Sequence, residues 1–437
     1  MAIAKAAVIV IIVVLALLSC GSIPGIARSR QNSSSLPTEI SDAEFWRMIE
    51  DFSEPGGTYP YENFVSNEQK AQQIFPALTM TTKRGGVFLG VGPEQNFTYV
   101  SALHSQMAFI IDIRRQNMLE LLLYKALFEL SPTRAEFVGR LFSRPMPGGL
   151  SENESVASLF AAIDKVEANA NFHAQNLQSI KSAFAKHGYK LTDDDLLRID
   201  YIYQVFYRGG PSINYSFMSP SPIQNPASYA TIMNSPDSTG HNWAFLANEE
   251  NYRYVRELQR KNMIVPLVGD FAGPRVIRNI GRYLKEHGSV VSAFYVSNVE
   301  SYFDAQKTQI FYSNVSTLPV DASSMFIRFV DGDHTPSLPW WKSGMGNLNV
   351  ISPMIDVTSQ VLAGRQVRYD DTLKATKDPL AMAGLSRTSD LGVGPIVFVP
   401  KGAPAPAGYT MIGTTKQTIQ LLNGSQSAVD LDVYTRK

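Results

Sequence analysis

Short apolar runs alternate with longer amphipathic stretches along the middle of the chain. The apolar runs lie at residues 86–92, 107–112, 263–268, 290–297 and 325–330. Runs that are apolar at nearly every position are typical of parallel strands, because helices cover both faces of such a sheet. The pattern therefore predicts an α/β protein with a mostly parallel sheet.

Helical sequence dominates the interval between the second and third apolar runs. A broad apolar face with helical spacing follows the second run and is formed by Leu119, Leu122, Leu123, Ala126, Leu127 and Leu130. Helical patterns continue from residue 151 to about residue 208, and a loop rich in Ser, Pro and Asn follows at 209–242. Loops of this length are often lids or binding segments. We therefore expect a large helical insertion at about 151–263.

The pattern also sets the limits of the globular part. The stretch SDAEFWRMIEDF begins with a capping residue, Ser41 or Asp42, and continues with apolar residues at helical spacing. We expect the main domain to cover residues 41–335. Residues 336–394 are interpreted as a linker with a short helix. Residues 395–437 have short alternating runs between proline and glycine turns, which predict a small β-rich appendage.

The N-terminus has the features of an export signal. One early lysine precedes an apolar run from Ala6 to Leu18. This run is shorter than the ~20 residues that span a bilayer, and its length is typical of the apolar region of a signal peptide. We therefore expect residues 1–20 to form the signal and residues 21–40, which are mostly polar, to form a flexible tether.

The sequence LLSC, which ends at Cys20, resembles the bacterial lipobox. This resemblance implies cleavage before Cys20, attachment of a lipid to it, and an exported protein anchored to the membrane of the cell envelope. A plain signal peptide or an uncleaved apolar anchor is the alternative. Arg28 and Arg30 follow the apolar run, so an anchor that faces the cytoplasm also remains open.

Composition excludes several other classes of protein. The 437 residues include 39 basic and 39 acidic side chains, so no basic surface for nucleic acid is expected. The 44% of hydrophobic residues can fill a sizeable core. Cys20 is the single cysteine of the chain, which rules out an intrachain disulfide and a cysteine zinc site.

Two clusters of acids could suggest a metal site, but both have a simpler interpretation. Asp193, Asp194 and Asp195 stand at a capped helix start, where acids interact favourably with the helix dipole. The cluster of Asp331, Asp333 and His334 has no second histidine at ligand spacing and is interpreted as a solvated turn. We therefore expect no metal. The sequence also has no nucleophile elbow, no phosphate loop and no zinc-protease helix.

Glycine and polar residues follow the predicted strands. Gly90 and Gly92 allow a tight turn before a helix, and Asp112 ends the second strand. Asp270 ends the third strand and Asn298 the fourth. Ligands of open parallel sheets bind beyond the carboxyl ends of the strands, so these five residues should line one edge of a Rossmann-like sheet. Each of them could instead be a turn former or a loop cap.

Residues 85–114 and 264–303 resemble class I S-adenosylmethionine-dependent methyltransferases. The resemblance implies that the loop GVGPEQN, with Gly90, Gly92, Gln95 and Asn96, passes the methionine part of the cofactor. It assigns Asp112 to the ribose, Asp270 to the adenine amine and Phe271 to a flank of the adenine ring. It also places Ser297 and Asn298 near the substrate. The same stretches resemble an uncharacterised family of bacterial lipoproteins, which implies no activity.

Two functions of different classes follow. The first is an S-adenosylmethionine-binding, methyltransferase-like protein whose acceptor is unknown and for which no catalytic residue is assigned. The second is a non-enzymatic, membrane-anchored, exported lipoprotein that uses a Rossmann-like scaffold to bind a small molecule or a protein. The acids at the strand ends favour the first function, and the export signal favours the second.

Overall fold

The protein is described here by a computed structural model. It describes residues 35–436 except 147, 219–220, 222, 224–225, 344, 386–395, 402–408 and 421–425. The predicted signal, Cys20 and the tether up to residue 34 lie outside the described residues. Within them, no helix has the length and apolar character needed to cross a membrane.

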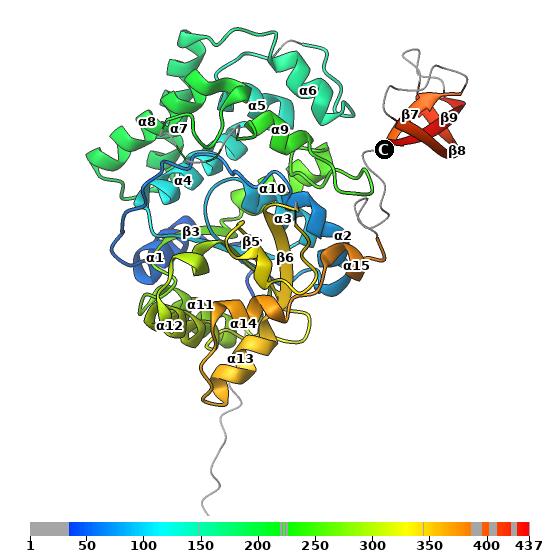
Figure 1. Ribbon diagram of the computed structural model, residues 1–437. Coiled ribbons are helices and arrows are strands. Elements are labelled where there is room, and N and C mark those ends of the chain that lie inside the picture. The colour runs from blue at the N-terminus through cyan, green and yellow to red at the C-terminus, as the bar shows by residue number, and fades with distance from the viewer. Residues whose placement is uncertain are drawn as a thin grey trace, which may run out of the picture. The chain divides into compact units, whose positions relative to one another are not determined.

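A six-stranded sheet forms the centre of the main domain (Figure 1). Its strands are β1 (Val87–Gly90), β2 (Met107–Asp112), β3 (Ile264–Val268), β4 (Val291–Ser297), β5 (Met325–Val330) and β6 (Leu348–Pro353). The order is β3-β2-β1-β4-β5-β6, with parallel pairing from β3 to β5 and an antiparallel β6. The predicted fold class, a Rossmann-like α/β protein with a mostly parallel sheet, is confirmed.

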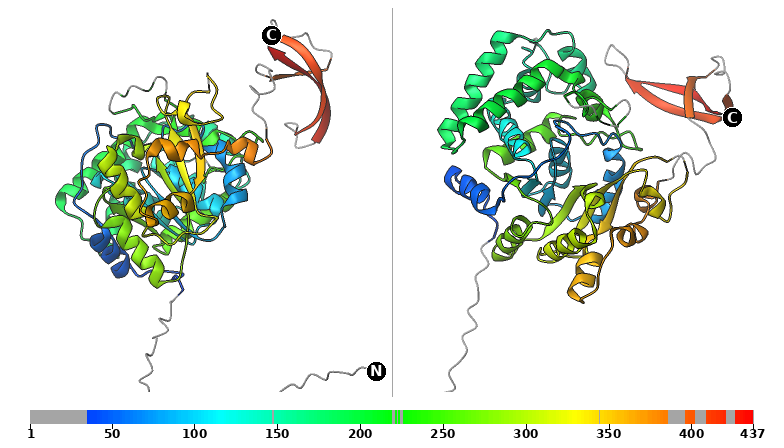
Figure 2. Two further views of the ribbon diagram at one scale, coloured as in Figure 1. Left: turned by 60° about the horizontal axis from the view of Figure 1, so that its bottom comes forward. Right: turned by 60° about the vertical axis from the view of Figure 1, so that its left-hand side comes forward.

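Helices cover both sides of this sheet, as the views in Figure 2 show. Helices α3 (Gln95–Leu103), α4 (Arg115–Leu130) and α10 (Glu249–Arg260) pack against one another on one face. Helices α1 (Asp42–Phe52), α11 (Val276–Glu286) and α12 (Ala305–Val315) lie on the other face. The strand side chains are therefore enclosed, and every residue of β1, β2 and β3 is buried. This burial explains their continuous apolar runs.

The predicted helical insertion is present between β2 and β3. It follows α4 and α5 (Arg134–Leu141), contains α6 (Val156–Ile163), α7 (Ala170–His187), α8 (Asp193–Gly209) and α9 (Tyr229–Asn234), and ends with α10. The three consecutive aspartates begin α8. There Thr192 and Asp195 form a capping box, and Arg115 of α4 pairs with Asp195 at 2.7 Å. Asp195 therefore stabilises a helix start and a helix–helix contact.

The region at 336–394 contains more structure than a linker and a short helix. It holds the sixth strand, β6, followed by α13 (Met354–Leu362), α14 (Tyr369–Lys374) and α15 (Pro379–Met382). The sequence pattern did not show β6 because Asn349 and Ser352 interrupt its apolar residues. Both side chains are nevertheless buried, since Asn349 donates to Glu68 and Ser352 accepts from Arg328.

The remaining elements are a segment before the sheet and the C-terminal strands. The 3-10 turn Ala71–Ile74 and α2 (Phe75–Thr81) precede β1. Strands β7 (Ile396–Pro400), β8 (Tyr409–Gln420) and β9 (Gln426–Arg436) form a separate antiparallel sheet in the order β7-β9-β8, drawn in red in Figure 2. This sheet is the predicted β-rich appendage.

Candidate functional site at the carboxyl edge of the sheet

The residues predicted at the strand ends share one edge of the sheet. Gly90 ends β1, Asp112 ends β2 and Ser297 ends β4. Asp270 lies two residues beyond the end of β3, and Asn298 directly follows β4. Because these four strands are parallel, their carboxyl ends meet at the edge where open α/β sheets bind ligands.

The glycine turn after β1 is held closed by Asn96. A β-carbon on Gly90 would lie 1.9 Å from Asn96 Oδ1, so a side chain at Gly90 would displace Asn96. The Asn96 side chain donates to three turn carbonyls, those of Val91, Gly92 and Pro93, at 3.0, 3.1 and 2.7 Å. Gly92 has a φ of +77°, which favours glycine, and its carbonyl also accepts from Asn117 at 3.1 Å. The carbonyl groups of the turn are therefore already bound by two asparagine side chains, one from α3 and one from α4.

Asp112 forms an ion pair inside its own loop. Its Oδ1 accepts from the backbone N and Nε of Arg114 at 2.8 and 3.0 Å, and its Oδ2 accepts from Nη2 at 2.8 Å. Arg114 also donates to the carbonyl of Glu62. Burial lowers the pKa of Arg114, but the Asp112 carboxylate outweighs burial and raises it. Both oxygens that a ribose would use already accept hydrogen bonds from this guanidinium.

Asp270 and Phe271 are adjacent in sequence but differ in environment. Phe271 is buried, and its ring lies 5.1 Å from that of Phe294 and 5.6 Å from that of Phe311. Asp270 is partly exposed, accepts from the backbone N of Ala272 and lies 3.4 Å from Lys307 Nζ. Asp270 therefore remains accessible at the edge, whereas Phe271 belongs to the core.

Ser297 has an unusual backbone conformation and a buried partner. Its φ is +50°, which costs free energy in any residue with a β-carbon, and the pairing register of β4 shifts between Tyr295 and Ser297. The hydroxyls of Ser297 and Tyr295 each donate to Glu68 Oε1 at 2.6 Å. The amides of Gln95 and Asn349 donate to Glu68 Oε2. Four donors thus surround one carboxylate.

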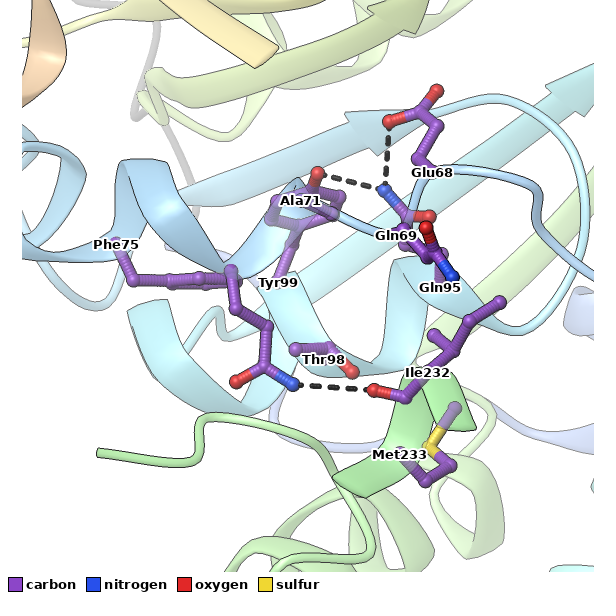
Figure 3. Close-up of a pocket in the computed structure, with 10 residues that line it drawn as sticks. Glu68, Gln69, Ala71, Phe75, Gln95, Thr98, Tyr99, Ile232 and Met233 are labelled. Atoms are coloured by element: carbon purple, nitrogen blue, oxygen red, sulfur yellow. Dashed lines mark hydrogen bonds between the residues drawn. The ribbon is translucent and has the colours of Figure 1, made fainter. Parts of the chain in front are cut away.

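Glu68 was not among the predicted site residues, although only 1% of its surface is exposed. Burial raises the pKa of its carboxyl, and the four hydrogen bonds oppose that shift. Its sequence context, VSNEQKAQ, is polar and resembles a surface loop, so no sequence signal marked it. Gln95, predicted to face a cofactor, instead joins Glu68 to the hydroxyl of Tyr99 (Figure 3).

A small cavity lies beside Glu68, Gln95 and Tyr99. Figure 3 shows its lining, which α2, α3 and α9 complete. Its volume is about 10 Å³, which is at the lower limit for one water molecule. The cavity at this part of the edge is therefore far smaller than a nucleoside.

A segment of the chain before β1, residues 54–68, crosses the strand ends; we call it the strap. Near its beginning, the backbone N of Glu54 donates to the carbonyl of Val268 at 2.8 Å, at the end of β3. The backbone N of Gly57 donates to the carbonyl of Ile113 at 2.7 Å, just after β2. The strap thus binds carbonyl groups at two of the strand ends.

The later part of the strap reaches β1 and β4. The backbone N of Ser66 donates to the carboxyl of Glu94 at 3.2 Å, in the turn after β1, and Glu68 accepts from Ser297 at the end of β4. Its last residues, 64–66 and 68, are buried, whereas residues 54–63 are exposed or half-buried. The strap therefore has an anchored inner part and a more exposed outer part.

Three tyrosine hydroxyls meet over the outer part of the strap. The hydroxyl of Tyr59 lies 3.2 Å from those of Tyr215 and Tyr302, and Asn298 donates to Tyr302 at 3.3 Å. Tyr215 belongs to the long loop predicted to be a lid or binding segment. Asn298 is thus joined to the strap through Tyr302, which is 58% exposed.

Two buried acids lie beside the glycine turn. Burial raises the pKa of Glu94 to about 7, although the backbone N of Ser66 donates to it. Burial, together with the nearby Glu94, raises the pKa of Glu120 well above its usual range. Among the described residues, neither oxygen of Glu120 has a hydrogen-bond partner. Burial therefore favours the neutral, protonated form of both carboxyls next to the candidate site.

The described part of the chain contains no group of three His, Cys, Asp or Glu side chains that could hold a metal ion. His334 pairs with Asp331 through Nδ1 and Oδ1 at 2.9 Å, within one turn.

The residue types that the methyltransferase resemblance assigns to this edge are present, and their polar atoms already have partners within the protein. A glycine turn, a helix start and an acid at the end of β2 are present. In this conformation, however, Arg114 occupies both oxygens of Asp112, and Asn96 and Asn117 occupy the turn carbonyls. The strap also lies across these strand ends.

The fold and this edge define a Rossmann-type α/β protein. A family model described as "Domain of unknown function (DUF7790)" matches residues 63–389. Since this match covers most of the chain, the protein belongs to that family. The matched region contains the whole six-stranded sheet and stops before β7. A search of curated proteins found no match.

Proposed function

We propose that this protein binds the nucleoside part of S-adenosylmethionine in a methyltransferase-like frame. The observation that carries the proposal is the meeting of a glycine turn, Asp112 and Asn298 at one edge of a sheet with the order β3-β2-β1-β4-β5. That order is shared by nucleotide-binding sheets, whose ligands bind at this edge.

The proposal assigns binding and leaves the acceptor open. Asp112 would hold the ribose after exchanging Arg114 for the sugar hydroxyls, and Asp270 would face the adenine amine. Ser297 and Asn298 would lie toward the acceptor. Methyl transfer in such a site would rely on holding the two reactants in line, so no general base is assigned.

A non-enzymatic, exported and membrane-anchored binding protein is the second candidate. It is favoured by the ion pair between Asp112 and Arg114 and by the strap, because together they occupy the positions that a nucleoside would need. In this case the Rossmann-type frame would serve as a scaffold, and lipid on Cys20 would hold the protein at the membrane.

Calorimetric titration of the full-length chain with S-adenosylhomocysteine tests the first candidate. We expect micromolar binding that is lost in Asp112→Asn and kept in Asp356→Asn, a matched change on the exposed face of α13. Circular dichroism must show that both variants are folded. Failure of the folded wild-type chain to bind at millimolar ligand would refute the proposal.

Lipid labelling in cells tests the membrane anchor of the second candidate. Radiolabelled or alkyne-tagged palmitate should label the wild-type chain and leave Cys20→Ala unlabelled. Equal labelling of the two chains would contradict lipid attachment at Cys20.

A further inference from the structure

The outer part of the strap, residues 54–63, buries none of its side chains. Four of these residues are proline or glycine, namely Pro55, Gly56, Gly57 and Pro60, and the remaining side chains are exposed or half-buried. The inner part differs, because Phe64 and Val65 belong to the hydrophobic core. Opening the outer part would therefore expose no core residue, but it would break hydrogen bonds together with the ring contacts Tyr59–Tyr302 and Tyr61–Tyr215, whose centroids lie 6.0 and 5.9 Å apart.

One of those hydrogen bonds joins the outer part to α4, where Gln116 Nε2 donates to the Glu62 carboxylate at 2.6 Å. Besides the two backbone bonds to the strand ends, the Glu54 carboxylate accepts from the backbone N of Arg275 and Val276 at 2.7 and 2.8 Å, at the start of α11. The Tyr59 hydroxyl joins Tyr215 and Tyr302. Each such bond contributes little net stability because water replaces it when the segment opens.

The outer part also holds Arg114 on Asp112. The Glu62 carbonyl accepts from Arg114 Nη1, and the Arg114 guanidinium carbon lies 5.7 Å from the centre of the Tyr59 ring. Asn63 lies 3.8 Å from the place where a β-carbon of Gly92 would stand. Withdrawal of residues 54–63 would therefore uncover the glycine turn and remove two of the contacts that fix Arg114.

We propose that residues 54–63 act as a gate: they occupy the crevice in the closed state and swing out from the anchored residues 64–68. The identity of the incoming ligand, an S-adenosyl nucleoside, rests on the function proposed above. The opening of residues 54–63 does not depend on that function. The observed affinity for a ligand is the intrinsic affinity multiplied by the fraction of molecules that are open, so a variant that raises a small open fraction by some factor should tighten binding by that factor.

Amide hydrogen exchange of the full-length chain without ligand tests the gate directly. The amides of Glu54 and Gly57, which bond to the strand ends, should exchange faster than those of β1 and β2. Tyr59→Phe removes the hydroxyl that joins Tyr215 and Tyr302 but keeps the ring, and it should speed exchange in 54–63 about fivefold. Tyr254→Phe, which removes the hydroxyl bonded to the Ser105 carbonyl at 3.0 Å, is the matched control and should leave 54–63 unchanged.

Calorimetry on the same variants separates the gate from the proposed function. If both hold, Tyr59→Phe should bind S-adenosylhomocysteine about fivefold more tightly than wild type. Faster exchange without binding at millimolar ligand would support the gate and refute nucleoside binding. Exchange in 54–63 that is as slow as in β1, in wild type and in Tyr59→Phe, would show that the strap is a fixed wall and would overturn the gate, whatever the affinity.

Discussion

Two buried charged clusters in this protein differ in how completely their polar atoms are paired. Beside β5 and β6, Arg328 pairs with Glu300 and also donates to Ser352, while the Tyr312 hydroxyl donates to Glu300 at 2.7 Å. Beside the glycine turn, Glu94 and Glu120 leave three carboxyl oxygens without partners among the described residues.

This difference in pairing indicates that the Arg328 cluster has a structural role, whereas Glu94 and Glu120 belong to the candidate site. A buried ion pair whose donors and acceptors are all engaged fixes the position of two strands. Buried acids with unpaired oxygens have raised pKa values and cost stability once they ionise, which proteins tolerate mainly where groups serve binding or chemistry. The unpaired acids lie next to the glycine turn, where the nucleoside is proposed to bind.

The largest expected effect comes from breaking the paired cluster. Arg328→Met leaves the Glu300 carboxylate buried without its cation, so we expect a loss of about 3–5 kcal/mol in the free energy of unfolding. Urea denaturation measures this loss. Arg47→Met is the control, because Arg47 pairs with Glu44 on the surface and should change stability by less than about 1 kcal/mol. A loss in Arg328→Met as small as in the control would contradict the comparison.

In the cluster with unpaired oxygens, removing an acid should instead raise the free energy of unfolding. The pKa of Glu94 is raised to about 7 in the fold, so stability is fully present below its unfolded value of 4.5 and is lost as pH rises through 7. Glu94→Gln keeps an oxygen for the Ser66 amide and should recover on the order of 3 kcal/mol at pH 8. Denaturation at pH 5 and pH 8 measures the change. The exposed Glu286→Gln should show none, and a destabilised Glu94→Gln would reverse our interpretation.

A third cluster, around His187, tests whether complete pairing of the polar atoms also shifts the pKa of a histidine. Both ring nitrogens of His187 face carboxylates, at 2.8 Å from Asp42 and 2.7 Å from Glu129, so the ring must carry both protons to donate to each. The bond to Glu129 is the main cause that raises the His187 pKa; burial opposes it, and the bond to Asp42 adds to the increase. Two other groups face this site: Lys125, which pairs with Glu129, and Tyr189, whose ring stacks on that of His187.

The stability that this cluster contributes is therefore lost both at high pH and in acid. The stability that its charge contributes is present below pH 6.5 and is lost as pH rises through the raised pKa. Although burial raises the pKa of Asp42 and Glu129, their hydrogen bonds lower it, so their contribution is lost only in acid, below the usual values of 3.8 and 4.5. His187→Gln should remove about 1 kcal/mol at pH 6 and much less at pH 9, since the site is partly solvated. An equal loss at both pH values would contradict a charged ring.

The smallest expected effect concerns Ser297, which lies at the end of β4 beside Glu68. Ser297→Ala and Ser297→Gly both remove the hydroxyl that donates to Glu68, so their difference isolates the backbone. At a φ of +50°, Ser297→Gly should be more stable than Ser297→Ala by about 1 kcal/mol. Thermal denaturation measures the difference. Equal stability would show that this backbone conformation is not strained.

The strands and the glycine turn could be predicted because their signals are local. Strands buried on both faces need mostly apolar side chains, and β1 to β5 have them except at Asp112, Ser292, Ser297 and Arg328. Strand β6 was missed because Asn349 and Ser352 are polar, and their burial depends on Glu68 and Arg328 in distant segments. The strap was missed for a similar reason, since no local pattern marks a segment that crosses the strand ends.

The sequence by itself determined which residue types end each strand and therefore that Gly90, Asp112, Ser297 and Asn298 share one edge. Only the tertiary structure decided which partner each of them has. Glu68 meets Ser297 and Asn349 across more than two hundred residues of chain, and Arg114 is held partly by the strap. Periodicity records the environment along one element, but the partner of a buried polar group depends on how all the elements pack.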